Sequence, residues 1–167
     1  MLVGAPGSGK SSVLEALTTL LEIEGTPYGA IESEQLSWGL PLLAAADWIP
    51  QLAAVIEMQR AVGRSLFLVA ATPESAEELR GVVAAVAAER VLVVCLRASP
   101  DVVAARVGAR EPDSWPGKQP LIAHARELAR SLPAMAGIDV VIDTDERDAV
   151  SVAGEIRAAL NRGLEPR

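Results

Sequence analysis

The sequence predicts an α/β protein built on a parallel β-sheet with helices on both faces. Two continuous apolar runs, at residues 65–71 and 91–96, are typical of strands that are covered on both sides. Segments with apolar residues at helical spacing separate such runs along the chain. Strands that alternate with helices pair in parallel through right-handed crossovers. A length of 167 residues, 50% of them hydrophobic, is enough for one domain with a full core.

The other expected elements follow from periodicity and from residues that start or stop helices. Further strands are expected at 2–3, 28–31 and 140–142. Helices are expected over residues 10–22, 34–46, 47–61, 72–88, 99–109, 121–132 and 148–160. Gly39 and Pro41 should interrupt the second of these helices, and Asp47 should cap the third. Both Thr72-Pro73-Glu74 and Ser99-Pro100-Asp101 carry the cap, proline and acid that open a helix.

The stretch Gly4-Ala5-Pro6-Gly7-Ser8-Gly9-Lys10-Ser11 fits the phosphate-binding motif G-x-x-x-x-G-K-[ST] at every fixed position. It follows an apolar lead-in and precedes a helical pattern, as the motif requires. Its glycines permit backbone angles closed to other residues, so that amide N–H groups can surround a phosphate chain. Lys10 would add a charge for the phosphates, and the Ser11 hydroxyl is placed to bind Mg²⁺. The sequence therefore predicts a nucleoside triphosphate site that also includes Ser12.

Composition excludes several other classes of protein. A net charge of −7 argues against a nucleic-acid-binding surface, which needs a basic face. The lone cysteine, Cys95, lies in an apolar run and is expected to fill a strand. No uncharged apolar stretch is long enough to span a membrane, and no signal-peptide pattern begins the chain. A cytoplasmic protein that contacts no membrane is therefore expected.

With these residues the chain resembles the P-loop small-molecule kinases, a superfamily that includes nucleoside-monophosphate, adenylylsulfate, shikimate, gluconate and chloramphenicol kinases. The loop, the order of elements and the chain size agree over nearly the whole length. The resemblance implies a three-layer fold, a five-stranded parallel sheet in the order 2-3-1-4-5, and a lid over the phosphates of ATP. It implies one domain over 1–162, with an acceptor-binding region at about 32–64, a lid at about 106–120 and a tail at 163–167. A monomer or a homodimer is expected.

The resemblance also suggests an acid near the acceptor hydroxyl. Such kinases often carry acidic residues directly after the second strand, and Glu32-Ser33-Glu34 occupies that place here. A carboxylate there can accept the hydroxyl proton or orient the hydroxyl for in-line attack on the γ-phosphorus. Glu32 is the preferred candidate for this role. Alternatively, both glutamates only begin a helix, where acids are favourable.

Two further groups of site residues follow from the same resemblance. Arg106 and Arg110 lie four residues apart, on one helical face, and are expected to be lid arginines that stabilise the transferring phosphoryl group. Lys118 could act similarly. The alternative is that these are solvated charges paired with nearby acids. In the family the loop after the last strand packs on the adenine, which implies this place for Thr144 in Asp143-Thr144-Asp145; the alternative is that these residues cap the following helix.

One departure from the family pattern concerns the metal. Many relatives end the third strand with an aspartate that helps to hold Mg²⁺, whereas this chain has Ala70, Ala71 and Thr72. Metal binding would then depend on Ser11, on the nucleotide's oxygens and on water. The missing aspartate leaves open a nucleotide-binding regulatory module without transfer activity. A switch-type NTPase is less well supported, because the chain lacks an N-K-x-D motif.

Charge in the acceptor-binding region limits what the acceptor can be. Residues 11–59 contain seven acids and no Lys or Arg. Anionic acceptors are usually held by arginines, so a neutral or amine-bearing alcohol is expected. Trp38, Trp48 and Tyr28 would offer flat apolar surface, or would only pack the region. Arg60 could reach inward, which keeps an anionic acceptor, a nucleoside monophosphate or adenylylsulfate, as the alternative. The predicted function is transfer of the γ-phosphoryl group of Mg-ATP to a small-molecule hydroxyl.

Overall fold

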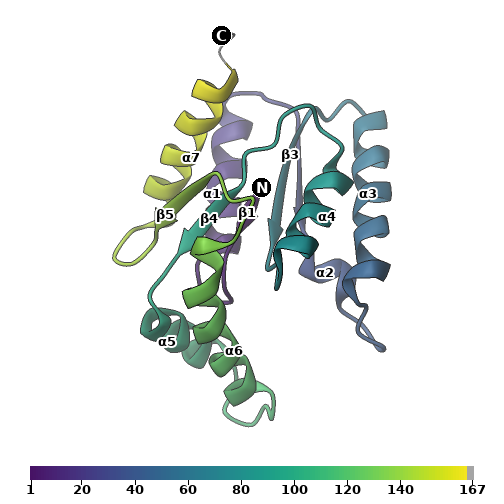
Figure 1. Cartoon of the computed structure of the whole chain (residues 1–167). Coiled ribbons are helices and arrows are strands. Elements are labelled where there is room, and N and C mark those ends of the chain that lie inside the picture. Colours follow the sequence, from purple (N-terminus) through teal and green to yellow (C-terminus); the bar gives the residue numbers. More distant parts are fainter. Residues whose placement is uncertain (165–167) are drawn as a thin grey trace.

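The computed structural model describes residues 1–164 and contains one five-stranded sheet with helices on both faces (Figure 1). The strand order is β2-β3-β1-β4-β5, and every neighbouring pair is parallel. The fold class and the strand order expected from the resemblance are therefore confirmed. The strands are β1 (Leu2–Val3), β2 (Tyr28–Glu32), β3 (Leu66–Ala71), β4 (Val94–Arg97) and β5 (Val140–Asp143).

Helices connect the strands at each crossover, and one 3₁₀ turn, η1 (Leu132–Ala134), precedes β5. The helices are α1 (Lys10–Ile23), α2 (Glu34–Ser37), α3 (Ala45–Ala61), α4 (Ala76–Val86), α5 (Pro100–Arg110), α6 (Lys118–Ser131) and α7 (Ala149–Leu164). Residues 165–167, part of the expected tail, lie outside the described residues. No helix within residues 1–164 is both long enough and apolar enough to cross a bilayer.

The core has two sides because successive strand residues point to opposite faces of the sheet. Leu68 and Ala70 of β3 pack in the core under α1 and α7, whereas Val69 and Ala71 pack against α3 and α4. β4 alternates in the same way, since Leu96 joins the first core and Cys95 faces α5 and α6. This is why the strands read as continuous apolar runs.

All the loops that follow the carboxyl ends of the strands meet at one edge of the sheet. β1 leads into residues 4–9 and α1, β2 leads into Ser33 and α2, β3 into Thr72, and β5 into Thr144. Ligands of open parallel sheets bind at this edge. The fold thus brings together the residues singled out in the sequence after the first, second and last strands.

Several helix boundaries differ from the sequence prediction. The expected helix over 34–46 is only the single turn of α2, followed by a cis Leu40–Pro41 bond, as the interrupting residues suggest. α3 begins two residues before Asp47, so the predicted cap is wrong. α4 is capped by Ser75, whose side chain accepts from the Glu78 amide, because residues 72–74 still belong to the loop after β3. α6 begins at Lys118, inside the expected lid.

Candidate functional site

The loop between β1 and α1 has the backbone that its glycines permit. Gly7 and Gly9 have φ values of 83° and 98°, a region that side-chain-bearing residues avoid. A Cβ atom at Gly4 would lie 2.4 Å from Ser8 Oγ and 2.8 Å from Leu96 O, so this position has no room for one. The Ser8 amide donates to Ala5 O at 3.1 Å and closes the turn. These features produce a tight concave loop at the N-terminus of α1.

Lys10 is turned back onto this loop. Its Nζ donates to the carbonyl oxygens of Gly4 and Ala5 at 3.0 and 3.3 Å. Nζ also lies 3.5 Å from Glu34 Oε1, and Lys10 is only 8% exposed. Burial lowers the pKa of Lys10, and the negative charge of Glu34 partly offsets this. The ammonium group therefore lies beside the loop, bound to carbonyl and carboxylate oxygens that phosphate oxygens could replace.

Glu34, in the single turn of α2, faces Lys10 from across the sheet edge. It accepts a hydrogen bond from the Thr72 hydroxyl in addition to its ion pair with Lys10. Burial alone would raise the pKa of Glu34, but the Lys10 charge and the Thr72 hydrogen bond outweigh it, so the pKa is lowered. Glu34 is therefore an ionised carboxylate beside the phosphate-binding loop.

Glu32, the acid preferred from the sequence, is placed differently. It is the last residue of β2 and pairs with Ala70 in the sheet. Its one side-chain hydrogen bond within residues 1–164 is a marginal 3.5 Å approach from Gln35 Nε2. Burial lowers the pKa of Lys10, and the charge of Glu32 helps to raise it. Glu32 does not line the two cavities that Glu34 lines. Glu34 therefore lies between the two cavities, while the role of either acid in transfer stays a prediction.

Arg106, on α5, joins the loop to the last strand. Its guanidinium donates to Gly7 O at 3.2 Å and to Thr144 O at 3.0 Å. Arg110, one turn later, pairs with Glu111 at 2.7 Å and also faces the loop. Both arginines line the loop cavity, but the pair with Glu111 is the alternative considered for Arg110, and the role of both arginines in transfer stays a prediction.

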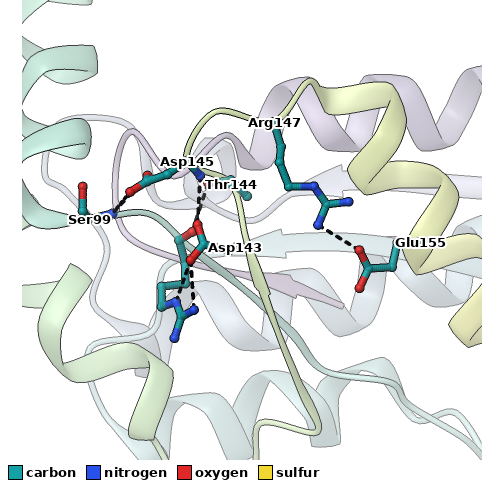
Figure 2. A network of polar contacts seen from close by, with 7 residues as sticks. Ser99, Asp143, Thr144, Asp145, Arg147 and Glu155 are labelled. Atoms are coloured by element: carbon teal, nitrogen blue, oxygen red, sulfur yellow. Dashed lines mark hydrogen bonds and ion pairs between the residues drawn. The ribbon is translucent and has the colours of Figure 1, made fainter.

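The loop after β5 is fixed by a polar network (Figure 2). The Thr144 hydroxyl donates to Ser8 O at 3.0 Å, which ties this loop to the phosphate-binding loop. Asp145 accepts from the Ser99 amide, and Asp143 accepts from the Asp145 amide at 3.0 Å and from Arg97. The Asp145 amide and then Arg97 hold the pKa of Asp143 below its usual range.

Three adjoining cavities surround these residues. The first, here called the loop cavity, measures about 440 Å³ and is lined by the loop and α1 together with Glu34, Arg106 and Arg110. The second, the α7 cavity of about 290 Å³, lies over Thr144 and the start of α7. Ser11 and Ser12 both line the loop cavity, and Ser12 also lines the α7 cavity.

The third, the α3–α4 cavity, measures about 550 Å³ and lies on the other side of Glu34. Trp48 of α3, Val82 of α4 and Ala71 of β3 form part of its apolar wall. Glu34 lines this cavity as well as the loop cavity, and Leu121 of α6 does the same. The carboxylate of Glu34 therefore stands at the boundary between two spaces large enough for two ligands.

Several residues expected at the acceptor lie elsewhere. Arg60 donates to the backbone oxygens of Val86 and Ala87 and stacks over Phe67, away from the α3–α4 cavity. Trp38 is 84% exposed and lines none of the three cavities. The structure therefore places Arg60 and Trp38 away from the α3–α4 cavity, and their assignment to substrate binding stays a prediction that this placement does not favour.

Two other suggestions from the sequence also change. Tyr28 begins β2, at the end of the strand opposite the loops, where its hydroxyl donates to Glu22. Lys118 pairs with Asp113 at 2.6 Å, which is the alternative considered for it. Trp48 alone of the three aromatic residues proposed for the acceptor lines the α3–α4 cavity.

Sequence reasoning missed Thr72 and Ser33 as site residues. Thr72 follows β3 at the place where an aspartate was looked for, and its hydroxyl instead holds Glu34. Ser33 lies between the two candidate acids and is 2% exposed at the wall of the α3–α4 cavity. The sequence signal that could have identified Thr72 and Ser33 as site residues is their position directly after a predicted strand.

The residues present fit a magnesium–nucleotide complex. Ser8 Oγ is buried without a hydrogen-bond partner, and the loop surrounds a concave space beside the Lys10 ammonium. No group of three or more His, Cys, Asp or Glu within residues 1–164 is arranged to hold a metal ion by itself. A metal here would therefore take most of its ligands from phosphate oxygens and water, with Ser11 as the protein ligand.

Comparisons with solved structures find the same fold over almost the whole chain. The shikimate kinase from Acinetobacter baumannii in complex with shikimate is 17% identical with a TM-score of 0.62, over 98% of this chain and 93% of that one. A gluconokinase from Sinorhizobium meliloti is 24% identical with a TM-score of 0.62, over 98% and 96%. The tunicamycin resistance protein of Deinococcus radiodurans is 19% identical with a TM-score of 0.69, over 95% and 92%.

No protein-family model matches the sequence, and no curated protein matches it. The chain nevertheless has the same fold as these proteins. At such low sequence identity the likeness establishes the architecture alone.

Proposed function

We propose that this protein is a phosphotransferase that moves the γ-phosphoryl group of ATP to a hydroxyl of a small, non-anionic molecule. The kinases with the same fold act on small molecules, which supports this general class of reaction. The observation that carries the proposal is the position of Glu34. Its carboxylate lies at the boundary between the loop cavity and the α3–α4 cavity.

The two cavities have the character that donor and acceptor sites need. The loop cavity offers backbone amides, the Lys10 ammonium and two guanidinium groups, which suit a phosphate chain. The α7 cavity continues from it through Ser12 and would receive the base. The α3–α4 cavity is mainly apolar on the far side of Glu34 and would receive the acceptor.

The transfer step is an in-line displacement. The acceptor oxygen bonds to the γ-phosphorus while the bond from phosphorus to the β–γ bridging oxygen breaks, and ADP leaves. The hydroxyl proton passes to the carboxylate of Glu34, which Thr72 and Lys10 keep ionised before the acceptor binds. Lys10, Arg106 and Arg110 stabilise the charge that spreads over the phosphoryl oxygens.

Mg²⁺, when bound through Ser11, would neutralise part of the phosphate charge and orient the chain. The protein's own contribution is then to position the hydroxyl and to exclude water. Gly9 would present its amide to the phosphates, and Lys10 would exchange its carbonyl partners for phosphate oxygens. Such an exchange requires only rotation of a side chain.

The charge of the acceptor follows from the wall of the α3–α4 cavity. Its described lining contains three glutamates, Glu34, Glu74 and Glu78, and no Lys or Arg. A phosphate or carboxylate on the acceptor would meet repulsion there and find no guanidinium to bind. Arg60, which could have reached inward to an anionic acceptor, does not line this cavity. A neutral or amine-bearing alcohol is compatible with the charge of the residues that line the α3–α4 cavity.

A direct test is incubation with Mg-ATP and separate panels of sugars, aminoglycosides, nucleoside monophosphates and adenylylsulfate. The expected result is ADP release with a new phosphate monoester, detected by mass spectrometry, on neutral or amine-bearing alcohols. Efficient phosphorylation of an anionic acceptor alone would contradict the assignment of the acceptor. ATP binding without transfer to any alcohol would instead favour a nucleotide-binding regulatory module.

A further inference from the structure

The α3–α4 cavity holds more negative charge than catalysis needs. Glu34 accounts for the reacting hydroxyl, yet Glu74 and Glu78 also line the cavity, from the loop after β3 and the first turn of α4. We propose that the acceptor is an amino alcohol with an apolar body, whose ammonium group binds at Glu74 and Glu78 while its hydroxyl lies at Glu34. This inference rests on the proposed phosphotransferase activity.

The carboxylates of Glu74 and Glu78 differ in the hydrogen bonds and ion pairs that they already make. Glu78 Oε2 accepts from the Glu74 amide at 2.9 Å, and the Glu78 amide donates to the Ser75 hydroxyl, so Glu78 also caps α4. The Glu74 side chain is 67% exposed, and its contact in the described structure is His124 Nε2 at 3.2 Å. Glu74 is therefore the carboxylate with most capacity for a new cation.

Ser33 offers a polar group to a ligand in this cavity. It is 2% exposed, it lines the cavity, and its side chain does not cap α2. Its hydroxyl is not among the fully enclosed side-chain oxygens that lack a partner within residues 1–164, which are Ser8 Oγ and Gln59 Oε1. The Ser33 hydroxyl is therefore open to a hydrogen bond with a hydroxyl or amine of the ligand.

The remaining wall determines the rest of the molecule. Trp48 is 7% exposed and presents its ring to the cavity beside Val82 and Ala71. At the rim, Leu42 is 71% exposed and lines the cavity with Leu43. Such surfaces favour an aromatic or branched aliphatic body between the two polar ends. A highly hydroxylated sugar would leave these surfaces without matching contacts.

Matched compounds can separate charge from shape. 2-Amino-3-phenylpropan-1-ol carries the ammonium group, 2-methyl-3-phenylpropan-1-ol is its neutral analogue of the same shape, and 3-phenyllactate is an anionic hydroxy acid with the same ring. Ethanolamine has the ammonium and hydroxyl groups without the apolar body. Calorimetric titration of each into the full chain with Mg-ADP should show the amine binding at least about tenfold more tightly than the neutral analogue. The anion and ethanolamine should bind more weakly still.

Variants test whether Glu74 causes the preference for the amine over its neutral analogue. Glu74→Gln keeps the shape and removes the charge, so the preference for the amine over the neutral analogue should fall toward parity. Glu77→Gln removes the same charge three residues further along, in the first turn of α4, but Glu77 is exposed and does not line the cavity, so the preference should remain. Glu78→Gln retains an oxygen that can accept from the Glu74 amide, so α4 stays capped while the preference weakens.

The outcomes distinguish this inference from the proposed activity. Equal binding of the amine and its neutral analogue, tighter binding of the anion, or no binding of any of the four would overturn the inference. An amine preference that survives Glu74→Gln and Glu78→Gln would also overturn it. ATP binding by the unaltered chain is measured in parallel. Absence of ATP binding would count against the phosphotransferase itself.

Discussion

Lys10 Nζ and Glu34 Oε1 lie 3.5 Å apart and connect the phosphate-binding loop to the segment after β2. The pair links the proposed donor and acceptor sites, because Lys10 lines the loop cavity and Glu34 lines both that cavity and the α3–α4 cavity. Glu34 is 58% exposed, so the ion pair is accessible to ligands and is screened by water. Phosphate binding at Lys10 would release Glu34 for the acceptor hydroxyl.

Glu34→Gln should lower phosphoryl transfer by about 10²–10⁴-fold while leaving ATP binding nearly intact, because an amide cannot accept the hydroxyl proton. Glu32→Gln is the matched control, since Glu32 ends β2 outside both cavities. Single-turnover rates and calorimetry on both variants measure the two effects separately. A larger loss in Glu32→Gln than in Glu34→Gln would restore Glu32 as the acid and contradict the assignment.

The lowered pKa of Glu34 predicts how the Lys10–Glu34 pair depends on pH. A depressed pKa means that the stabilisation is present above the ordinary value of 4.5 and is lost as the pH falls through the lowered value in the folded protein. The difference in unfolding free energy between the unaltered chain and Glu34→Gln should therefore shrink as the pH falls from 6 toward 3. Urea unfolding across that range measures it, and a difference that grows in acid would show that the sign is wrong.

Arg106→Ala should reduce transfer by about 10²–10³-fold and weaken ATP binding, because it removes a charge from the loop cavity. It also removes the guanidinium contacts to Gly7 O and Thr144 O. Arg126→Ala is a suitable control, since Arg126 lies exposed on α6 and reaches only Asp101, at 3.4 Å. Comparable losses in both variants would indicate a general electrostatic effect and not a role at the site.

Cys95 reports on the core without any ligand. It is fully buried in β4, and burial raises its pKa to about 11. Alkylation of the native protein at pH 8 should be at least about 10²-fold slower than that of a free cysteine, because little thiolate is present and access requires unfolding. Adding urea should accelerate the reaction in step with global unfolding. Rapid native-state alkylation would contradict the placement of β4 inside the sheet, between β1 and β5.

The phosphate-binding loop could be predicted from the sequence because each backbone requirement of the loop is met by a particular residue type. Gly7 and Gly9 occupy positive φ angles, and Gly4 leaves room for Ser8. The strand order, by contrast, came from family resemblance, since periodicity alone indicates only a parallel sheet. Apolar runs do not specify which strands are neighbours.

The choice between the two acids could not be made from the sequence. β2 extends to Glu32, one residue beyond the predicted end, and the chain then turns into α2 after the Ser33 amide donates to Ala70 O at 2.9 Å. Side-chain direction changes at every residue near a strand end, so an error of one residue exchanges inward and outward positions. The contact between Thr72 and Glu34 exists only once β2 and β3 are paired.

The positions of Arg60 and Trp38 also could not be predicted from local patterns. Arg60 is held by backbone oxygens at the end of α4 and by the Phe67 ring, contacts between segments that are distant in sequence. Trp38 follows the short α2 and is left exposed because the expected longer helix does not form.

The most direct measurement is calorimetric titration of Mg-ATP into the unaltered protein and into Lys10→Ala. The unaltered chain should bind with a clear heat of association, and the variant should bind at least about tenfold more weakly and show no transfer, because the ammonium that faces the phosphates is gone. Thermal unfolding of both proteins serves as the folding control. Absence of binding by the folded, unaltered chain, or equal binding by Lys10→Ala, would contradict the account.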